Sequence, residues 1–272
     1  MYKEETSMKI LKKAFLVITL MIFATTSFAK EQKELLFYIG ITMIKPVSEL
    51  AKNFEKTHNC TIKILQGGSQ DLYDSIKMSK TGDLYLPGSV SYRDKNINDG
   101  LLLEGKFVGY NKVALVVKKG NPLNIKADLK ELSNPKYRVV LGNETSGSIG
   151  KKTKKVLQKF GNYEEAILNT VYLAPDSRNL TKSIVNDEAD LILNWYATSF
   201  WDQNKNLVEP LVIDEKYAKK AKLVFNLLQT SKNKSLAKKF MDYAASQEGR
   251  EVFFKYGFLD KKDLNNFDKV TF

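Results

Sequence analysis

The sequence predicts an α/β protein with mainly parallel sheets. Strand-like and helix-like segments alternate almost throughout the chain, a pattern typical of strands that are joined by crossover helices. No long Pro/Gly/Ser linker, low-complexity stretch or repeat of fixed period interrupts this alternation. Two lobes joined by strands would suit a chain of 272 residues without a single linker.

The individual elements follow from hydrophobic spacing. The first predicted strand, 35–39, precedes a helix in which the apolar residues between Val47 and Phe54 fall at positions i, i+3, i+4 and i+7 of one helical face. Pro46 suits the first turn of that helix. Further strands are predicted at 60–65, 84–86, 113–117, 138–141, 171–173 and 191–193. Further helices are predicted at 70–79, 151–160, 178–186, 235–246 and 250–256.

The N-terminus has the three parts of a secretory signal peptide. A lysine-rich start precedes the apolar run 14–23, and Ser27-Phe28-Ala29 supplies the small residues of a cleavage site. The apolar run is shorter than the ~20 residues that a membrane-spanning helix needs. We expect 1–29 to be the signal peptide, with cleavage after Ala29 and a periplasmic mature chain that begins at Lys30.

Composition narrows the classes of function. Cys60 is the single cysteine and His58 the single histidine, which excludes an intramolecular disulfide, a cysteine-based metal cluster and a His-rich metal site. We therefore expect neither a metal nor a cofactor. Removing the four lysines and two glutamates of 1–29 leaves 39 basic and 29 acidic residues, a net charge of +10. The lysines are scattered and no aromatic-rich basic motif occurs, so we expect no nucleic-acid partner. The densest lysine cluster, 151–155, is interpreted as a solvated helix face.

Four joints between a predicted strand and the following helix carry hydroxyl or glycine residues. They contain Thr42, Gly67-Gly68-Ser69, Thr145-Ser146-Gly147-Ser148 and Ser177. Backbone N–H groups at a helix start lack intrahelical partners and lie at the positive end of the helix dipole. In open α/β sheets, helix starts converge beyond the carboxyl ends of the strands, where ligands bind. The four joints together predict a site for a tetrahedral oxyanion or a carboxylate.

With these residues the chain resembles a periplasmic solute-binding protein of an ABC importer, close to the molybdate/tungstate-binding group. The resemblance covers nearly the whole mature chain. It rests on Tyr38-Ile-Gly-Ile-Thr-Met-Ile44, Gly67-Gly-Ser-Gln-Asp-Leu-Tyr73, Thr81-Gly-Asp-Leu-Tyr85, Asn194-Trp-Tyr-Ala-Thr198 and the closing segment 240–258. It implies a two-lobed type II periplasmic binding protein fold, each lobe a mainly parallel sheet flanked by helices, with the ligand in the interlobe cleft. Lobe 1 would comprise 30–110 and 223–272, and lobe 2 would comprise 111–222.

The resemblance also implies the ligand-binding residues and the partners. Side-chain hydroxyls would come from Thr42, Ser69 and Tyr196, with Gly68 beside Ser69. Backbone amides of the second lobe would come from around Ser146, Gly147, Ser148 and Ser177. Arg178 starts the following helix, where it could either reach a larger ligand bidentately or pair with a group on the surface. The expected partners are a small anion and the membrane permease of the importer, with the binding protein itself a monomer.

Some segments depart from the molybdate-binding pattern and leave the anion open. The stretch Gly40-Ile41-Thr42-Met43 stands where Ala-Ala-Ser-Leu is usual. In three features the chain is instead similar to the accessory-colonisation-factor branch of the same superfamily: Pro87-Gly88-Ser89, Trp195 and Trp201. Members of that branch are associated with larger carboxylate or phosphate ligands.

We therefore predict a binding protein, not an enzyme, that captures a small oxyanion such as molybdate or tungstate. The alternative ligand is a larger anion such as a carboxylate or a phosphorylated organic acid. An enzyme would depend on His58, which lies at what looks like an exposed helix end. A surface antigen or adhesin is the hypothesis from a different class, and the Asn-x-Ser/Thr sites of the chain do not distinguish it.

Overall fold

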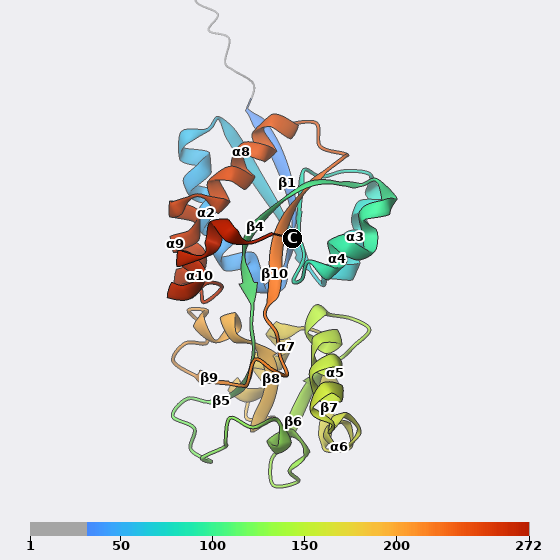
Figure 1. Ribbon diagram of the computed structural model, residues 1–272, viewed down its shortest axis with the longest axis vertical. Coiled ribbons are helices and arrows are strands. Elements are labelled where there is room, and N and C mark those ends of the chain that lie inside the picture. Colours follow the sequence, from blue (N-terminus) through green and yellow to red (C-terminus); the bar gives the residue numbers. More distant parts are fainter. Residues whose placement is uncertain (1–31, 272) are drawn as a thin grey trace, which may run out of the picture. The chain divides into compact units, whose positions relative to one another are not determined.

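The computed structural model describes residues 32–271 (Figure 1). The predicted signal peptide, 1–29, lies outside the described residues. The strands are β1 (Lys33–Gly40), β2 (Cys60–Gly67), β3 (Leu84–Leu86), β4 (Leu102–Asn111), β5 (Val113–Lys118), β6 (Val139–Gly142), β7 (Thr170–Ala174), β8 (Leu191–Trp195), β9 (Val208–Val212) and β10 (Ala221–Leu228). The α-helices are α2 (Ile44–Thr57), α3 (Ser69–Ser79), α4 (Ser91–Asn96), α5 (Ser148–Phe160), α6 (Tyr163–Leu168), α7 (Ser177–Val185), α8 (Lys234–Ala245), α9 (Gln247–Lys255) and α10 (Lys261–Asn265). Short 3-10 helices are η1 (Ile41–Met43), η2 (Ile97–Asp99), η3 (Leu129–Ser133), η4 (Tyr196–Phe200) and η5 (Phe267–Lys269).

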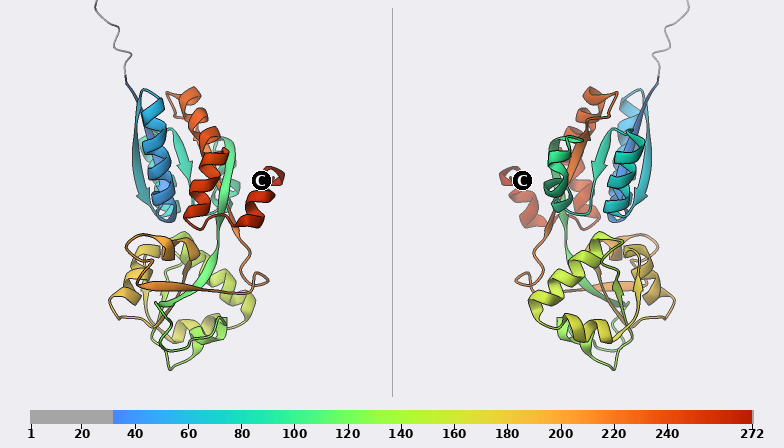
Figure 2. Two further views of the ribbon diagram at one scale, coloured as in Figure 1. Left: turned by 90° about the vertical axis from the view of Figure 1, so that its left-hand side faces the viewer. Right: turned by 90° about the vertical axis from the view of Figure 1, so that its right-hand side faces the viewer.

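The first sheet has the strand order β2-β1-β3-β10-β4. β1 pairs in parallel with β3, whereas β10 runs antiparallel to both β3 and β4. Alternate residues of β1 point to opposite faces, so Phe37 joins the core under α2, α8 and α9, and Tyr38 joins a smaller core under α3. The turned views show α2 and α8 on one side of this sheet and α3 on the other (Figure 2).

The second sheet has the order β7-β6-β8-β5-β9. β6 is parallel to β7 and β8, whereas β5 is antiparallel to β8 and β9. Both sheets are therefore mixed, which differs from the mainly parallel sheets that the alternation predicts. Parallel neighbours require a crossover connection that usually contains a helix. The β4–β5 and β9–β10 connections instead cross from one sheet to the other, and the strands that they deliver, β5 and β10, are the ones that pair in the antiparallel sense.

The predicted elements appear with small shifts in their ends. The spacing between Val47 and Phe54 forms the buried face of α2, and β3 matches its predicted range. Helix α5 starts three residues before its predicted range because the backbone of Gly147 is extended and serves as the N-cap. Cys60 is buried and free. The described helices, those within 32–271, are too short or too polar to cross a membrane.

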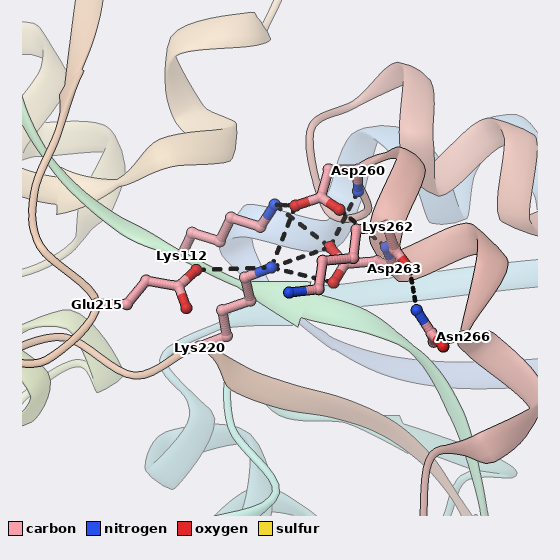
Figure 3. A network of polar contacts seen from close by, with 7 residues as sticks. All are labelled: Lys112, Glu215, Lys220, Asp260, Lys262, Asp263 and Asn266. Carbon is pink, nitrogen blue, oxygen red and sulfur yellow. Dashed lines mark hydrogen bonds and ion pairs between the residues drawn. The ribbon is translucent and has the colours of Figure 1, made fainter.

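Two lysines at the connections between the sheets converge on one short helix (Figure 3). Lys112 lies between β4 and β5, and Lys220 lies immediately before β10. Both ammonium groups contact Asp260 and Asp263 at the start of α10, at distances of 2.8–3.3 Å. The Asp263 side chain is 9% exposed. We call Lys112, Lys220, Asp260 and Asp263 the hinge cluster, because both connections between the sheets are attached to α10 through it.

Candidate ligand-binding site

Loops that follow five strands enclose one small cavity, which we call the turn cavity. Its lining residues are Gly40, Ile41, Thr42, Gly67, Gly68, Ser69, Gly88, Gly147, Ser148, Ile149, Asp176 and Ser177. They follow β1, β2, β3, β6 and β7, so both sheets contribute carboxyl-end loops to it. The cavity encloses about 20 Å³, close to the roughly 10–15 Å³ that one water molecule needs. A tetrahedral oxyanion would require the walls to separate.

Three helices begin at the turn cavity, each with a serine as its first residue. Ser69 begins α3, Ser148 begins α5 and Ser177 begins α7. These helices have 11, 13 and 9 residues, so each presents its first N–H groups and the positive end of its dipole near the cavity. Three of the four predicted joints therefore meet here as helix starts.

Ser69 is 2% exposed and tightly held. Its Oγ accepts a hydrogen bond from the backbone N–H of Gly88 at 3.0 Å, which leaves the hydroxyl proton to be donated. Its carbonyl oxygen accepts a hydrogen bond from the Tyr85 hydroxyl at 2.7 Å. A donor fixed from both sides loses little conformational freedom when a ligand binds.

Thr42 lies in η1 and is 4% exposed. It does not act as a side-chain N-cap, because neither η1 nor α2 has a capping hydrogen bond from a side chain. Its hydroxyl donates to the thioether sulfur of Met43 at 2.7 Å, and a thioether is a weak acceptor. An anion oxygen within reach would be the stronger acceptor for this proton.

Gly68 and Gly88 lie at close approaches across the turn cavity. A Cβ at Gly68 would lie 2.9 Å from the carbonyl oxygen of Ser146, and one at Gly88 would lie 2.6 Å from the Ser148 Oγ. Both distances are shorter than real Cβ contacts. The Ser148 hydroxyl could rotate away, whereas the Ser146 carbonyl belongs to the backbone and could not. Each close approach joins a loop of the first sheet to a loop of the second, so the absence of side chains here lets the two lobes approach.

Asp176 lines the turn cavity and was not predicted from the sequence. Its Oδ1 accepts hydrogen bonds from the N–H groups of Arg178 and Asn179, at 2.8 and 2.9 Å, and so caps α7. The capping carboxylate already occupies two of the amides that an anion could use. An Asp two residues before the predicted helix 178–186 was the available signal for this cap, because α7 starts one residue earlier, at Ser177.

The side chains of Ser146, Arg178 and Tyr196 do not line the turn cavity. The Ser146 hydroxyl donates to the carbonyl oxygen of Pro175 at 2.8 Å. The Arg178 guanidinium donates to Gln66 Oε1 at 2.8 Å and lines a separate, mixed-charge cavity that also includes Trp201.

Tyr196 lines another cavity, beside Lys112 and Asp260. Its ring packs against Phe200 with the ring centres 4.8 Å apart. Burial, with a further contribution from the charge of Asp260, raises the pKa of Tyr196.

Asn111 supports the turn cavity without lining it. It is fully buried, and its Nδ2 donates to the carbonyl oxygen of Gly88 at 2.8 Å. No local pattern could identify this residue, because it ends β4 and meets Gly88 only in the folded chain. His58, the single candidate for enzymatic catalysis, instead stacks on Phe54 with a centroid distance of 3.8 Å.

Comparison with known proteins identifies a match to one protein family. Residues 35–259 match the family model described as bacterial extracellular solute-binding protein. A putative binding protein of Haemophilus influenzae is 24% identical over 92% of this chain and 100% of its own length. The putative ABC transporter substrate-binding lipoprotein YvgL of Bacillus subtilis is 26% identical over 78% and 81%. The molybdate-binding protein ModA of Rhodobacter capsulatus is 20% identical over 83% and 88%.

Solved structures share the fold. The periplasmic molybdate-binding protein of Azotobacter vinelandii superposes with a TM-score of 0.71 and 16% identity, over 83% of this chain and 99% of its own. PEB3 with bound L-phospholactate superposes with a TM-score of 0.66 and 20% identity, over 83% and 99%. The predicted two-lobed type II binding-protein fold is thereby confirmed.

Proposed function

Because this chain belongs to the bacterial extracellular solute-binding protein family, we propose that it captures a small oxyanion of the molybdate or tungstate type between its two lobes. In this proposal it is the solute-binding component of an ABC importer and delivers the anion to a membrane permease. It acts as a monomer and carries out no chemical reaction on the ligand.

The observation that carries the proposal is the convergence of three serine-headed helix starts on one cavity. Ser69, Ser148 and Ser177 come from different helices and from both sheets. Hydroxyl and amide donors at helix starts replace the water shell of an oxyanion without a charged side chain. Thr42 adds a fourth hydroxyl. Binding would draw donors of both lobes onto one ligand and so favour a closed, hinge-rotated form.

A larger organic anion is the second candidate. A specific observation favours it: Ser148 of the turn cavity also lines an adjoining cavity of about 310 Å³ that contains four lysines. PEB3, which shares the fold, was solved with L-phospholactate bound. A carboxylate or phosphate group in the turn cavity could then carry a carbon skeleton into the adjoining space.

Export completes the proposal. We propose that 1–29 is a cleaved signal peptide that directs the chain to the periplasm, that 30–110 and 223–272 form lobe 1, and that 111–222 form lobe 2. Mass spectrometry of the secreted protein should find Lys30 at its N-terminus. An intact Met1–Ala29 segment on the exported protein would contradict this part.

Calorimetry on residues 30–272 tests the ligand class. The panel is molybdate, tungstate, sulfate, phosphate, citrate and 3-phosphoglycerate. We expect one ligand with micromolar affinity or better, and tight binding of molybdate or tungstate alone would select the first candidate. If none of the six anions gives a measurable heat of binding, the anion proposal is wrong.

A further inference from the structure

A second cavity adjoins the turn cavity and is dominated by lysines. We call it the lysine cavity. It measures about 310 Å³ and is lined by Ser89, Ser91, Tyr92, Lys95, Ser148, Lys151, Lys152, Lys155, Trp195 and Ala221. Four of these residues are lysines and none is acidic. The sequence alone suggests a solvated helix face for the cluster 151–155, whereas the structure places three of its lysines around a cavity.

The charges of the lysine cavity are not neutralised within the described part of the chain. None of its four ammonium groups forms an ion pair with an acidic residue of 32–271. Lys152 Nζ instead donates to the carbonyl oxygen of Lys219 at 2.6 Å, and Lys151 Nζ lies 5.2 Å from the centre of the Tyr92 ring. Lys154, on the same helix but outside the cavity, is paired with Glu144 at 2.7 Å.

The environment of Lys152 shows the cost of gathering these cations. Burial, together with the charges of Lys155 and Lys159, lowers the pKa of Lys152. An anion in the lysine cavity would relieve this repulsion by supplying the missing opposite charge.

Two buried donors of the lysine cavity also lack partners. Trp195 is 1% exposed and Tyr92 is 5% exposed. The Trp195 indole Nε1 and the Tyr92 hydroxyl have no hydrogen-bond partner among the described residues. An indole N–H can only donate, and buried polar groups in native proteins are nearly always paired. The lysine cavity therefore suits a ligand that brings acceptor oxygens.

The two cavities are joined at the start of α5. Ser148 lines both cavities, and Gly88 of the turn cavity directly precedes Ser89 of the lysine cavity. We propose that the lysine cavity binds the second anionic group of a small organic acid whose first anionic group occupies the turn cavity. This inference rests on the proposed function, because it takes the turn cavity to be an anion site.

Linkage of two anionic groups has a measurable signature. When one molecule joins two groups that bind separate subsites, the second contact becomes intramolecular and the affinity exceeds that of either fragment. Phosphate, glycerate and 3-phosphoglycerate form a suitable series for calorimetry on residues 30–272. We expect 3-phosphoglycerate to bind at least about a hundredfold more tightly than phosphate or glycerate.

Matched variants locate the effect. Lys155→Gln and Lys95→Gln each remove one charge from the lysine cavity, the first from α5 and the second from α4. Both residues are exposed, so folding should be unaffected. Each should weaken 3-phosphoglycerate binding about tenfold or more and leave phosphate unchanged. Lys154→Gln removes the same charge from the neighbouring position of α5 and should change neither affinity. Trp195→Phe keeps an aromatic ring but removes the N–H donor, and should also weaken only 3-phosphoglycerate.

The outcomes separate this inference from the proposed function. If phosphate and 3-phosphoglycerate bind equally well and the lysine variants alter neither, the lysine cavity has no such role, while the turn cavity remains an anion site. If Lys154→Gln weakens binding as much as Lys155→Gln, the effect is general attraction by positive charge and the inference is wrong. If no anion of either type binds, both the inference and the proposed function fail.

Discussion

Lys112 Nζ lies 2.8 Å from Asp260 Oδ2, and this ion pair joins the β4–β5 connection between the two sheets to the C-terminal helix α10. Lys220, at the end of the β9–β10 connection, contacts the same carboxylate at 3.1 Å. Burial alone would raise the pKa of Asp260, but hydrogen bonds from Lys112, from the N–H of Asp263 and from Lys220 hold it well below its usual range. The ionised form of Asp260 is therefore specifically stabilised by the fold.

The hinge cluster should make stability sensitive to acid. Because the pKa of Asp260 is lower in the folded chain than in the unfolded chain, its stabilisation is fully present above the unfolded value, near pH 4, and is lost as the pH falls below it. Urea unfolding at pH 5 and pH 2.5 should show a smaller decrease in the free energy of unfolding for Asp260→Asn than for the wild type. Asparagine retains the capping oxygen for α10. Equal decreases in both proteins would show that Asp260 contributes nothing to the acid sensitivity.

Ser69→Ala should weaken binding of the preferred anion. The substitution removes a buried hydroxyl that can donate to a charged ligand, and such a hydrogen bond contributes roughly 1–3 kcal/mol. Titration calorimetry should therefore show an affinity loss of between about fivefold and 150-fold. Ser235→Ala changes an exposed serine of α8 and serves as the control. An unchanged affinity for Ser69→Ala would remove Ser69 from the site.

Gly68→Ala should interfere with closure and leave the fold intact. The backbone of Gly68 is extended, with φ of −63° and ψ of 144°, which alanine adopts without strain. The new methyl group would collide with the carbonyl oxygen of Ser146 on the opposite loop. We expect binding to weaken by about tenfold, or ~1.4 kcal/mol, with little change in the melting temperature of the ligand-free protein.

Gly67→Ala is the matched control for Gly68→Ala. A Cβ at Gly67 would meet only Leu72, at an ordinary 3.4 Å. Small-angle X-ray scattering with saturating ligand should find Gly68→Ala more extended than Gly67→Ala. Identical compaction of the two variants would contradict a closure role for Gly68.

Asp176→Asn should strengthen binding of fully ionised anions. The carboxylate of Asp176 lines the turn cavity and repels an oxyanion placed there, whereas asparagine keeps the cap of α7 without the charge. Removal of a like charge in a partly buried site should improve the affinity for sulfate or molybdate by about tenfold or more. An unchanged or weakened affinity would contradict repulsion of the anion by the Asp176 carboxylate. Competition calorimetry at constant pH measures the difference.

The helix and strand positions were largely predictable because local spacing determines them. The apolar spacing from Val47 to Phe54 defined α2, and it lies on the buried face as expected. β4 and β10 were not predicted. Two glycines interrupt the alternation of apolar and polar residues in β4. The register between β4 and β10 also shifts at Leu223, and the spacing within one strand does not show this. β5 and β10 are the strands that the chain enters when it crosses from one sheet to the other, and each runs antiparallel to its neighbours. No local pattern encodes where the chain crosses between the sheets.

The lining residues of the turn cavity were predictable where their position in the backbone alone places them at the cavity. Ser69, Ser148 and Ser177 line it because each begins a helix that follows a strand. Arg178 and Tyr196 point to other cavities. This could not be predicted, because the local sequence does not determine which way a long side chain points. Asn111 and the lysine cavity depend on contacts between distant parts of the chain.

In the proposed function, the two cavities would recognise an anion with two kinds of donor. In the turn cavity, hydroxyl and backbone groups carry no net charge, whereas Lys95, Lys151 and Lys155 are exposed cations. Dissolved salt screens exposed charges over about 10 Å at 0.1 M but hardly affects short buried hydrogen bonds. Ionic strength would therefore act as a filter on selectivity. In dilute surroundings the protein would favour ligands by their total charge, and in saline surroundings it would favour them by the shape and oxygen arrangement of one anionic group.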